Sequence, residues 1–488
     1  MSGLWTSGTA LAAVDGSSSG PAWEASGISI DTRTLEPGDL FVALRDRRDG
    51  HDFVADAFRK GAAAALVSRV PEGVAQDAPL LICDDVQTGL ERLAAAARAR
   101  TEAKVIAVTG SAGKTSTKEM LRHVLGRQGR AHASEASFNN HWGVPLTLAR
   151  MPFDSEFAVI EIGMNRPGEI VPLARMARPH VAIVTTVAAA HLEAFSGIEE
   201  IAIEKGSIFQ GLEPDGVALF NADVETAPIL AAEARLHAAR QVGFGEGAQA
   251  VLRAERVTLT AEASVVEGRL EDGSFLMKVG APGRHLAMNA MSAIGAASLV
   301  GADLDIAVCD MGSWNVPMGR GRREAILLDP ANNLGIKLID DAFNANPASM
   351  AAALDVLAAS ETAAAAGRTA GGRTAGGRRI AILGDMLELG SREALLHSEL
   401  ADHAAMERID RVVCVGQRVR ALYDALPGER QRSWFETAEE LARTVHKHLA
   451  AGDVVLVKGS KGSRVSLVAE AIRALGRGHV GDEQKELD

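Results

Sequence analysis

Cysteines are scarce in this sequence and far apart. Cys83, Cys309 and Cys414 are the three cysteines in 488 residues, and no two of them form a CxxC pair. A disulfide framework usually uses an even, closely spaced set of cysteines, and a structural zinc site usually uses paired ones. The sequence therefore predicts neither of these, and it fits a reducing compartment.

The sequence also lacks long apolar runs and an excess of basic residues. No uninterrupted apolar stretch approaches the roughly 20 residues of a membrane-spanning helix. No basic segment followed by a long apolar core opens the chain, so we expect a cytoplasmic protein without membrane insertion. The net charge is −12 and no basic run is interleaved with aromatic residues, which argues against nucleic-acid binding. An anionic ligand must therefore be bound by a local group of residues.

One segment has the order of a nucleotide-binding loop. Apolar residues at 105–108 predict a strand, the sequence TGSAGKTST follows, and apolar residues then recur at helical spacing over 120–125. The N-terminal end of such a helix binds phosphate, and the glycines allow close backbone approach. Lys114 supplies a compact positive charge, and the Thr115 hydroxyl suits Mg²⁺.

The general pattern for such loops has a glycine six positions before the lysine, where this sequence has Val108. The loop is therefore a shortened form, and a purely structural glycine turn is the alternative. We favour nucleotide binding because strand, loop, Lys-Thr pair and amphipathic helix occur in the required order. The predicted ATP contacts are Gly110, Ser111, Ala112, Gly113, Lys114, Thr115 and Ser116.

Two further polar side chains follow predicted strands. Glu161 ends the strand predicted at 157–161, and His191 follows the one predicted at 181–187. Ligands of doubly wound sheets bind beyond the carboxyl ends of the strands, so both side chains are placed near the phosphates. A glutamate oxygen is a hard metal ligand and imidazole an acceptable one, which suits a second Mg²⁺. The alternative is a structural histidine, which is the commoner use.

The chain as a whole predicts three α/β domains. Residues 1–103 combine short strands at 27–31 and 38–44 with helical segments at 53–65 and 89–98, as a small mixed α/β domain would. Residues 104–315 alternate strands and helices, which is typical of a central, P-loop ATPase-like doubly wound sheet, and residues 316–488 repeat that pattern as a Rossmann-like domain.

The loop TGSAGKTST resembles the ATP loop of the Mur ligases, which build the peptide stem of bacterial peptidoglycan. The resemblance covers nearly the whole chain, from about Ser29 to Ile472. The other segments that carry it are SIDTRTLEPGDLFVALRDRRDGHDFVADAF, FNNHWGVPLTL, EIGMNRPGEI, VAAAHLEAFSGIEEIAIEKGSIF, GRHLAMNA, LIDDAFNANPASM, AILGDMLELG and VLVKGSKGSR.

The resemblance implies a metal site. In the family signatures the counterparts of Glu161 and His191 take part in metal binding, and the counterpart of Lys205 is carbamylated so that it supports the metal as a carboxylate would. Without the resemblance, the sequence around Lys205 predicts a solvated lysine on a helix. Arg166 stands where related ligases often carry His, so we assign it no role. The predicted metal residues are Thr115, Glu161, His191 and Lys205, and the predicted catalytic residues are Lys114, His191 and Lys205.

The resemblance also implies sites for the substrates. Residues Asp31, Thr32 and Arg33 would hold a uridine nucleotide, although a capped turn is the alternative. Asn139 and Asn140 would lie near the same substrate, although Asn is more often a turn former. Further expected ATP contacts are His285 and Asn289 at the adenine, where Leu286 replaces the usual first Asn, and Asp341 and Asn344, with Asn346 as a further candidate. The residues expected near an incoming dipeptide are Asp385, Glu388, Lys458, Ser460 and Arg464, for which caps and surface charge are the alternative.

Three local features complete the prediction. Asn346 and Pro347 predict a helix cap and first turn. The glycine-rich basic stretch 318–322 predicts an interdomain hinge. Residues 362–379 contain the tandem repeat GRTAGGRTAGGRR, which predicts a mobile surface insertion because it has little apolar surface to bury.

The implied function is ATP-dependent ligation in the cytoplasm. The expected substrates are UDP-N-acetylmuramoyl-tripeptide and D-Ala-D-Ala, the expected cofactors are ATP with two Mg²⁺, and we expect a monomer. One alternative is the family member that adds the third stem residue, whose DNPR signature is absent here. The other is an ATP-driven switch or partner-binding protein, because a phosphate loop alone specifies neither ligation nor an acceptor.

Overall fold

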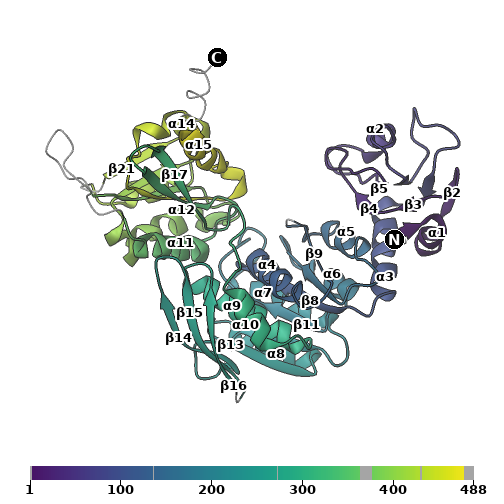
Figure 1. The fold of residues 1–488 in the computed structure, drawn as a ribbon, viewed down its shortest axis with the longest axis horizontal. Coiled ribbons are helices and arrows are strands. Elements are labelled where there is room, and N and C mark those ends of the chain that lie inside the picture. The colour runs from purple at the N-terminus through teal and green to yellow at the C-terminus, as the bar shows by residue number, and fades with distance from the viewer. Residues whose placement is uncertain (1–2, 136, 272, 363–375, 429–430, 478–488) are drawn as a thin grey trace.

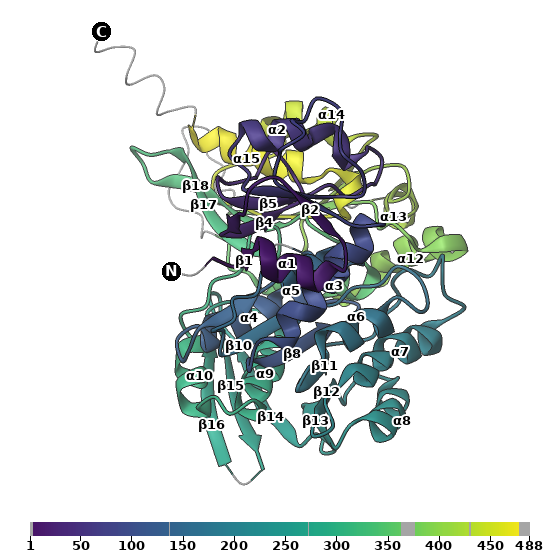
Figure 2. The same ribbon diagram turned by 90° about the vertical axis from the view of Figure 1, so that its right-hand side faces the viewer.

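The computed structural model describes residues 3–135, 137–271, 273–362, 376–428 and 431–477. Three sheet-containing units follow one another along the chain and form a V, with the first and last units as its arms (Figure 1). A second view shows both arms on the same side of the central unit (Figure 2). The expected α/β class with parallel sheets is therefore confirmed. Domain boundaries near residues 103 and 315 remain predictions.

The N-terminal unit is built on a five-stranded sheet in the order β2-β7-β6-β5-β4, in which β4 to β7 are parallel and β2 is antiparallel. Its strands are β1 (Trp5–Thr6), β2 (Ser17–Ser19), β3 (Glu24–Ala25), β4 (Gly27–Ser29), β5 (Asp39–Val42), β6 (Ala64–Val67) and β7 (Leu80–Ile82). Its helices are α1 (Ser7–Val14), α2 (Val54–Arg59) and α3 (Val86–Ala99).

The helix expected at 53–65 is wrong in its second half. Helix α2 ends at Arg59, Gly61 turns the chain with a φ of 93°, and residues 64–67 form the buried strand β6 between β5 and β7. A short alanine-rich run buried on both faces has no periodicity that separates strand from helix, so the sequence pattern was ambiguous there.

The central unit is built on a nine-stranded sheet in the order β16-β15-β14-β13-β12-β11-β8-β10-β9. Its strands are β8 (Lys104–Thr109), β9 (Ala131–Ala133), β10 (Phe157–Glu161), β11 (Val181–Val184), β12 (Val217–Asn221), β13 (Arg240–Gly245), β14 (Leu252–Leu259), β15 (Ser264–Leu270) and β16 (Gly273–Val279). Its helices are α4 (Lys114–Leu125), α5 (Gly143–Ala149), α6 (Ile170–Ala177), α7 (Ile198–Gly206), α8 (Ala227–His237), α9 (Arg284–Leu299) and α10 (Leu304–Met311).

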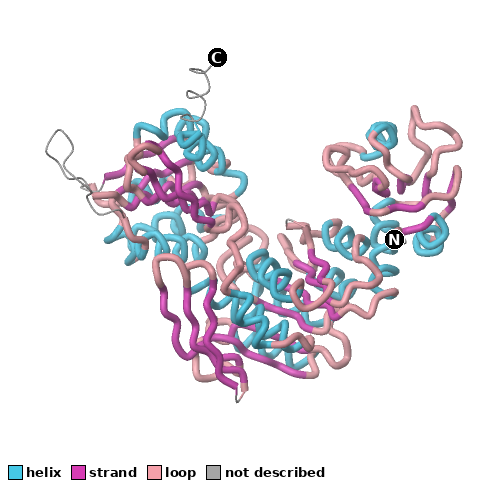
Figure 3. The backbone as a smooth tube through the Cα atoms, in the orientation of Figure 1, coloured by secondary structure: helices cyan, strands magenta, loops and turns pink. Residues whose placement is uncertain are grey.

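Successive residues of β8 point into different cores. Ile106 and Val108 pack in the cluster that includes α4 and α9, and Val105 and Ala107 pack in the cluster that includes α5, α6 and α7. Helices therefore cover both faces of the parallel part, as a doubly wound sheet requires. The antiparallel strands β14, β15 and β16 extend beside it (Figure 3).

The C-terminal unit is built on a six-stranded sheet in the order β17-β18-β22-β19-β20-β21, in which β17 is antiparallel and the other neighbours are parallel. Its strands are β17 (Arg322–Asp329), β18 (Leu334–Asp341), β19 (Arg379–Gly384), β20 (Arg411–Val415), β21 (Gln431–Phe435) and β22 (Val454–Lys458). Its helices are α11 (Pro347–Ala359), α12 (Glu393–Ser398), α13 (Arg420–Ala425), α14 (Ala438–Thr444) and α15 (Ser466–Arg477). Single 3₁₀ segments along the chain are Gly50–Phe53, Ser207–Gly211, Gly390–Arg392, Glu399–Asp402, Ala404–Arg408, Val445–Lys447 and Lys461–Ser463.

The start of α11 confirms the predicted cap. The Asn346 side chain accepts a hydrogen bond from the Ser349 amide at 2.9 Å, the Ser349 hydroxyl lies 3.0 Å from the Asn346 amide, and Pro347 is the first helical residue. This is the reciprocal arrangement of a capping box, which stabilises the first turn.

The prediction of a mobile surface insertion at 362–379 is wrong at the C-terminal end of that segment. Residues 363–375 lie outside the described residues, but Arg379 begins the buried strand β19. Arg378 binds the carboxylate of Asp453 at 2.6 Å, and Asp453 is only 1% exposed. A carboxylate buried to this extent needs a cationic or hydrogen-bonding partner, so Arg378 is part of the fold.

Within the described residues, none of the helices has the length and apolar character needed to cross a membrane.

Candidate active site

The phosphate loop joins β8 to α4. Gly110 and Gly113 have φ values of 150° and 85°, and Gly113 is the N-cap of α4. A Cβ added at Gly113 would lie 2.4 Å from Oδ1 of Asn289, and one at Gly110 would lie 1.9 Å from Oγ1 of Thr185. Both positions therefore require glycine, and the N–H groups that begin α4 are open to an anion.

Residues after β11 hold this loop in shape. Thr185 Oγ1 donates to the Ala112 carbonyl at 2.6 Å, and the Thr186 carbonyl accepts from the Ser111 amide at 2.8 Å. The Ser111 hydroxyl donates to the Ala188 carbonyl at 3.0 Å. The strand expected to run to Val187 ends at Val184, because the residues that follow bind the loop instead of extending the sheet.

The loop forms one wall of a cavity of about 460 Å³. The other walls include the start of α9, the connector before β17, the loop after β18 and the end of β22 in the C-terminal unit. The predicted ATP residues that line the cavity are Ser111, Ala112, Gly113, Lys114, Thr115, Ser116, His285, Asn289, Asp341 and Asn344. Gly110 lies behind this wall, where its carbonyl accepts from Nζ of Lys114 at 2.6 Å.

Lys114 is desolvated by the walls around it. This desolvation lowers the pKa of Lys114, the nearby Glu161 carboxylate opposes the shift, and the Arg320 guanidinium adds to it. Two cations and one carboxylate therefore meet at the end of the loop, which gives that end a net positive charge suited to phosphate oxygens.

Glu161 lies beside the loop because of the sheet register. Residue 161 pairs with Val108 where β10 runs parallel to β8, so its side chain emerges one residue before the loop turns. Its Oε1 accepts from Thr115 Oγ1 at 3.2 Å and from Asn139 Nδ2 at 2.8 Å. Its Oε2 is buried and has no hydrogen-bond partner among the described residues. A buried carboxylate oxygen without a donor, next to a hydroxyl, fits a magnesium ligand.

The structure brings part of the predicted metal set together. Among the residues that the structure describes, no group of three or more His, Cys, Asp or Glu side chains is close enough to hold a metal. The pair formed by Thr115 and Glu161 is brought together. Magnesium commonly keeps several waters and takes phosphate oxygens, so two protein ligands are compatible with it.

His191 lies against the C-terminal unit. Its Nδ1 is 2.5 Å from Oε2 of Glu388, and the Glu193 amide donates to the Glu388 carbonyl at 3.4 Å. His191 and Glu388 have φ values of 57° and 64°, which non-glycine residues seldom adopt. Two residues predicted for different sites, metal and dipeptide, therefore contact each other at a strained junction of the two units.

Lys205 is buried in α7. It is 1% exposed, and no hydrogen bond or ion pair joins its side chain to another described residue. Burial lowers its pKa well below the usual value for lysine, the nearby charge of Lys114 adds to the shift, and Glu204 opposes it. The interpretation of Lys205 as a solvated helix lysine is therefore wrong.

Arg320 is a site residue that the sequence reasoning missed. Its Nη2 donates to Thr115 Oγ1 at 3.0 Å, and its guanidinium lies 4.1 Å from the centre of the Phe343 ring. The sequence MGRGR indicated only a basic hinge. An arginine between two glycines carries no spacing signal that would have placed it in the cavity.

The C-terminal unit contributes a pair of opposite charges to the cavity. Asp341 and Lys458 are register partners of the parallel strands β18 and β22, and Lys458 Nζ lies 2.7 Å from Asp341 Oδ2 and 2.9 Å from the Asn344 carbonyl. Burial raises the pKa of Asp341 and Lys458 opposes the shift. Asn346 Nδ2 donates to the Ser111 carbonyl at 3.1 Å, which ties this unit to the phosphate loop.

Three other residues predicted near the dipeptide make local contacts. Asp385 Oδ1 accepts from the amides of Arg418 and Val419 at 3.0 and 2.8 Å. Ser460 Oγ accepts from the Leu387 amide at 3.0 Å. Arg464 lies 2.5 Å from Glu439, and its side chain is 65% exposed. The contacts of Asp385 and Arg464 match the alternative of caps and surface charge, whereas Ser460 is a buried link between loops. A dipeptide role for these residues stays a prediction.

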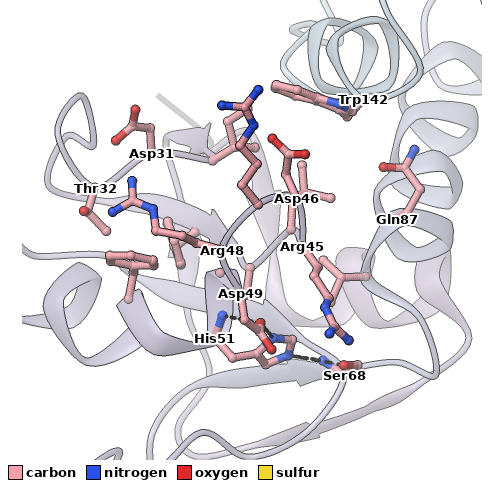
Figure 4. Close-up of a pocket in the computed structure, with 18 of the residues that line it drawn as sticks. Asp31, Thr32, Arg45, Asp46, Arg48, Asp49, His51, Ser68, Gln87 and Trp142 are labelled. Carbon is pink, nitrogen blue, oxygen red and sulfur yellow. Dashed lines mark hydrogen bonds and ion pairs between the residues drawn. The ribbon is translucent and has the colours of Figure 1, made fainter.

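A second cavity, of about 720 Å³, lies in the N-terminal unit (Figure 4). Asp31, Thr32 and Arg33 line one side of it, and Gln87 of α3 and Trp142 line another. Arg33 lies 2.5 Å from the Asp31 carboxylate and lowers the pKa of that group. The three residues predicted for the uridine nucleotide therefore border a cavity large enough for a ligand.

The segment before α5 reaches both cavities. Asn139 lines the cavity of the phosphate loop, and His141 and Trp142 line the N-terminal one. Asn140 closes the turn that leads into α5, because its Oδ1 accepts from the Gly143 amide at 2.8 Å, while Trp142 is the N-cap residue of that helix. The turn-forming alternative therefore describes Asn140, and Asn139 is directed to Glu161 instead.

A phosphate loop, an opposed carboxylate and three α/β units together define a nucleotide-dependent enzyme of the phosphate-loop class. Three family descriptions match the chain: "Mur ligase family, catalytic domain" at residues 24–100, "Mur ligase middle domain" at 108–297, and "Mur ligase, glutamate ligase domain" at 328–461. The chain belongs to the Mur ligase family and is an ATP-dependent ligase. The resemblance found in the sequence is confirmed.

The chain matches known relatives over almost its full length. The chain is similar to the UDP-N-acetylmuramoyl-tripeptide–D-alanyl-D-alanine ligase of Escherichia coli, with 36% identity over 450 residues that span 92% of this chain and 93% of that protein. The enzyme of the same name from Bacillus subtilis is 33% identical over 464 residues, 94% of this chain and 96% of that protein. The crystal structure of MurF from Acinetobacter baumannii aligns with a TM-score of 0.81 and 29% identity, covering 96% of this chain and 98% of that one.

Proposed function

We propose that this Mur ligase joins D-alanyl-D-alanine to UDP-N-acetylmuramoyl-tripeptide, with conversion of ATP to ADP and phosphate, as a cytoplasmic step of peptidoglycan synthesis. The observation that carries the proposal is the set of groups around the phosphate loop, where Lys114, Thr115 and the buried Glu161 face one cavity. The printed names of the full-length relatives supply the pair of substrates.

The position of the two cavities supports the path of the larger substrate. The uridine end would lie in the N-terminal cavity beside Asp31, Thr32 and Arg33. Asn139 borders the cavity of the phosphate loop, and His141 and Trp142 border the N-terminal one, so a substrate held there could extend its peptide carboxylate along this segment to the phosphate loop. The incoming dipeptide would approach from the C-terminal unit, near Glu388 and Lys458.

The reaction would take place in two steps. An oxygen of the substrate carboxylate attacks the γ-phosphorus, ADP leaves, and an acyl phosphate forms. The dipeptide amine then attacks the acyl carbon, and the tetrahedral intermediate expels phosphate and loses the amine proton to give the amide. Lys114 and Arg320 would balance the charge that develops on the phosphoryl oxygens, which is the main catalytic contribution expected in phosphoryl transfer.

The side chains at the loop fit magnesium. Thr115 Oγ1 and Glu161 would hold the ion, and a bound Mg²⁺ would neutralise charge on the phosphates. In this proposal His191 leaves Glu388 and supports a second ion.

Lys205 would act as a carbamate. Carbamylation joins CO₂ to a neutral amine with loss of one proton, and burial together with the charge of Lys114 favours the neutral form of Lys205. The product carries a carboxylate-like anion at a buried position that has no protein partner among the described residues, and such an anion would support a metal beside the loop.

A coupled phosphate-release assay tests the function. We expect release only when ATP, Mg²⁺, UDP-N-acetylmuramoyl-tripeptide and D-Ala-D-Ala are all present. Equal release with UDP-N-acetylmuramoyl-dipeptide and a single amino acid would instead identify the ligase for the third stem residue. Release that depends on neither acceptor would favour an ATP-driven switch.

A further inference from the structure

The loop at 45–49 in the N-terminal cavity carries three arginines that form no ion pair among the described residues, although the charge of Arg48 helps to lower the pKa of Asp31. Arg45, Arg47 and Arg48 line the cavity, and no ion pair joins any of them to another described residue. All three are exposed, and the Arg48 guanidinium lies 5.0 Å from the centre of the Phe53 ring. In a chain with a net charge of −12, three unpaired guanidinium groups on one loop form a local site for an anion.

The base of this loop is fixed by the backbone. Arg45 and Asp49 form an antiparallel bridge, and the Asp46 amide donates to the Arg48 carbonyl at 3.1 Å. The Gly50 amide donates to the Leu44 carbonyl at 2.9 Å, and a Cβ at Gly50 would lie 2.4 Å from that same oxygen. The arginine loop, residues 45–48, is therefore a short hairpin with a narrow base and an exposed tip.

His51 ties the base of the hairpin to Ser68, the residue that follows strand β6. Its Nδ1 lies 2.6 Å from Asp49 Oδ1, and its Nε2 accepts from the Ser68 amide at 2.9 Å (Figure 4). Because Nε2 is an acceptor, the ring proton is on Nδ1 and is donated to Asp49. The other Asp49 oxygen accepts from Arg69 Nη2 at 2.8 Å, and the His51 side chain is only 5% exposed.

The order Asp49, His51, Ser68 is also that of a hydrolase triad, since Ser68 Oγ lies 3.2 Å from His51 Nε2. A triad histidine must accept the serine proton at Nε2. Here the Ser68 amide already uses that lone pair at 2.9 Å. The imidazole is therefore a fixed connection between the hairpin and the sheet, and not a general base.

We propose that His51 is a positioning residue for the diphosphate of the uridine substrate. Through Asp49 it holds the arginine loop over the cavity, so that the guanidinium groups of Arg45, Arg47 and Arg48 meet the two phosphates while residues 31–33 face the uridine end. The inference rests on the proposed function, because it assumes that this cavity binds the uridine nucleotide.

The experiment compares UDP with uridine as ligands of the full-length protein by titration calorimetry. His51→Gln keeps a polar side chain near Ser68 but shortens the connection to Asp49. We expect it to weaken UDP binding by roughly tenfold or more, the effect of about one charge-assisted hydrogen bond, and to leave uridine binding unchanged. An equal loss for both ligands would show a merely structural role and would overturn the proposal.

Two further variants keep the test decisive if His51→Gln does not fold. Asp49→Asn should give the same selective loss of UDP binding, and combination with His51→Gln should add little, because both changes break one connection. Arg47→Gln combined with Arg48→Gln should also weaken UDP but not uridine, whereas the exposed Arg59→Gln on α2 should change neither. Unchanged UDP affinity in the double arginine variant would contradict the proposal.

Steady-state kinetics should agree with the binding data. We expect His51→Gln to raise KM for UDP-N-acetylmuramoyl-tripeptide roughly tenfold and to leave kcat and KM for ATP near their original values. A fall in kcat at an unchanged KM would contradict a positioning role. If the original protein binds neither UDP nor uridine, the site assignment in the proposed function fails first, which distinguishes the two failures.

Discussion

Thr115 Oγ1 lies 3.2 Å from Glu161 Oε1, and Glu161 Oε2 beside it is buried without a hydrogen-bond partner among the described residues. The sheet register that pairs residue 161 with Val108 produces this relationship. It brings a hydroxyl at the start of α4 next to a carboxylate at the end of β10, and it leaves one oxygen of that carboxylate for a ligand.

Glu161→Gln should weaken the dependence of ATP binding on Mg²⁺. An amide oxygen is a poorer ligand for a hard cation than a carboxylate oxygen, so we expect a Mg²⁺ requirement raised by about tenfold or more. A fluorescent ATP analogue titrated with Mg²⁺ measures this directly. Glu255→Gln, an exposed carboxylate on β14, is the control, and equal Mg²⁺ curves for the two variants would exclude Glu161 as a ligand.

Lys114→Ala should remove most turnover without unfolding the protein. The side chain lines the cavity and, among the described residues, its hydrogen bond is to the carbonyl of Gly110 in its own loop, so we expect kcat to fall by about 10²- to 10³-fold and the thermal transition to stay nearly unchanged. Single-turnover phosphate release measures the loss of turnover, and differential scanning calorimetry measures the thermal transition. Near-normal kcat in the folded variant would contradict the assignment of the loop.

Lys205→Ala should lose most activity and regain part of it with formate or acetate. The small acid would replace the anion that we assign to the carbamate, and the vacated side-chain volume gives it room. Lys205→Arg should not be rescued in the same way, because its fixed positive charge opposes a metal. Full activity of Lys205→Arg, or wild-type activity of Lys205→Ala at limiting CO₂ and Mg²⁺, would exclude a carbamate at this residue.

Arg378→Met should destabilise the C-terminal unit by about 2 to 3 kcal/mol, somewhat below the value for a fully buried pair because Arg378 is 32% exposed. Asp453 would remain buried without its cation. Urea unfolding followed by the hydrogen exchange of the β19 and β22 amides reports on this unit, and Arg408→Met, an exposed arginine in the same unit, is the control. A shift no larger than that of the control would show that the Arg378 contact does not stabilise the unit.

The sequence predicted the parts of the site that depend on local order. The Asn346 cap is determined by neighbouring residues, because its hydrogen bonds with Ser349 close within three positions. The phosphate loop was recognised from the order of strand, glycines, Lys-Thr pair and helix, although residues 185–188 hold it in shape. The contact between Thr115 and Glu161 depends on sheet register, and the rule that ligands gather at strand ends was enough to anticipate it.

The missed features depend on packing between distant segments. Lys205 has the pattern of a surface lysine, and only the packing of α7 buries it. Arg320 comes from a glycine-rich connector whose path is set by the two units it joins. The contact between His191 and Glu388 crosses two units that follow separate sequence patterns, so no local signal could have placed those side chains together.

The most direct test of the central claim is transfer of ¹⁸O from the substrate carboxylate to phosphate. UDP-N-acetylmuramoyl-tripeptide labelled in its terminal carboxylate is turned over with ATP and D-Ala-D-Ala, and the released phosphate is analysed by mass spectrometry. Ligation through an acyl phosphate predicts one ¹⁸O in each phosphate and a pentapeptide product. Unlabelled phosphate would mean that water attacks ATP, and it would contradict the assignment of this chain as the ligase that adds the dipeptide.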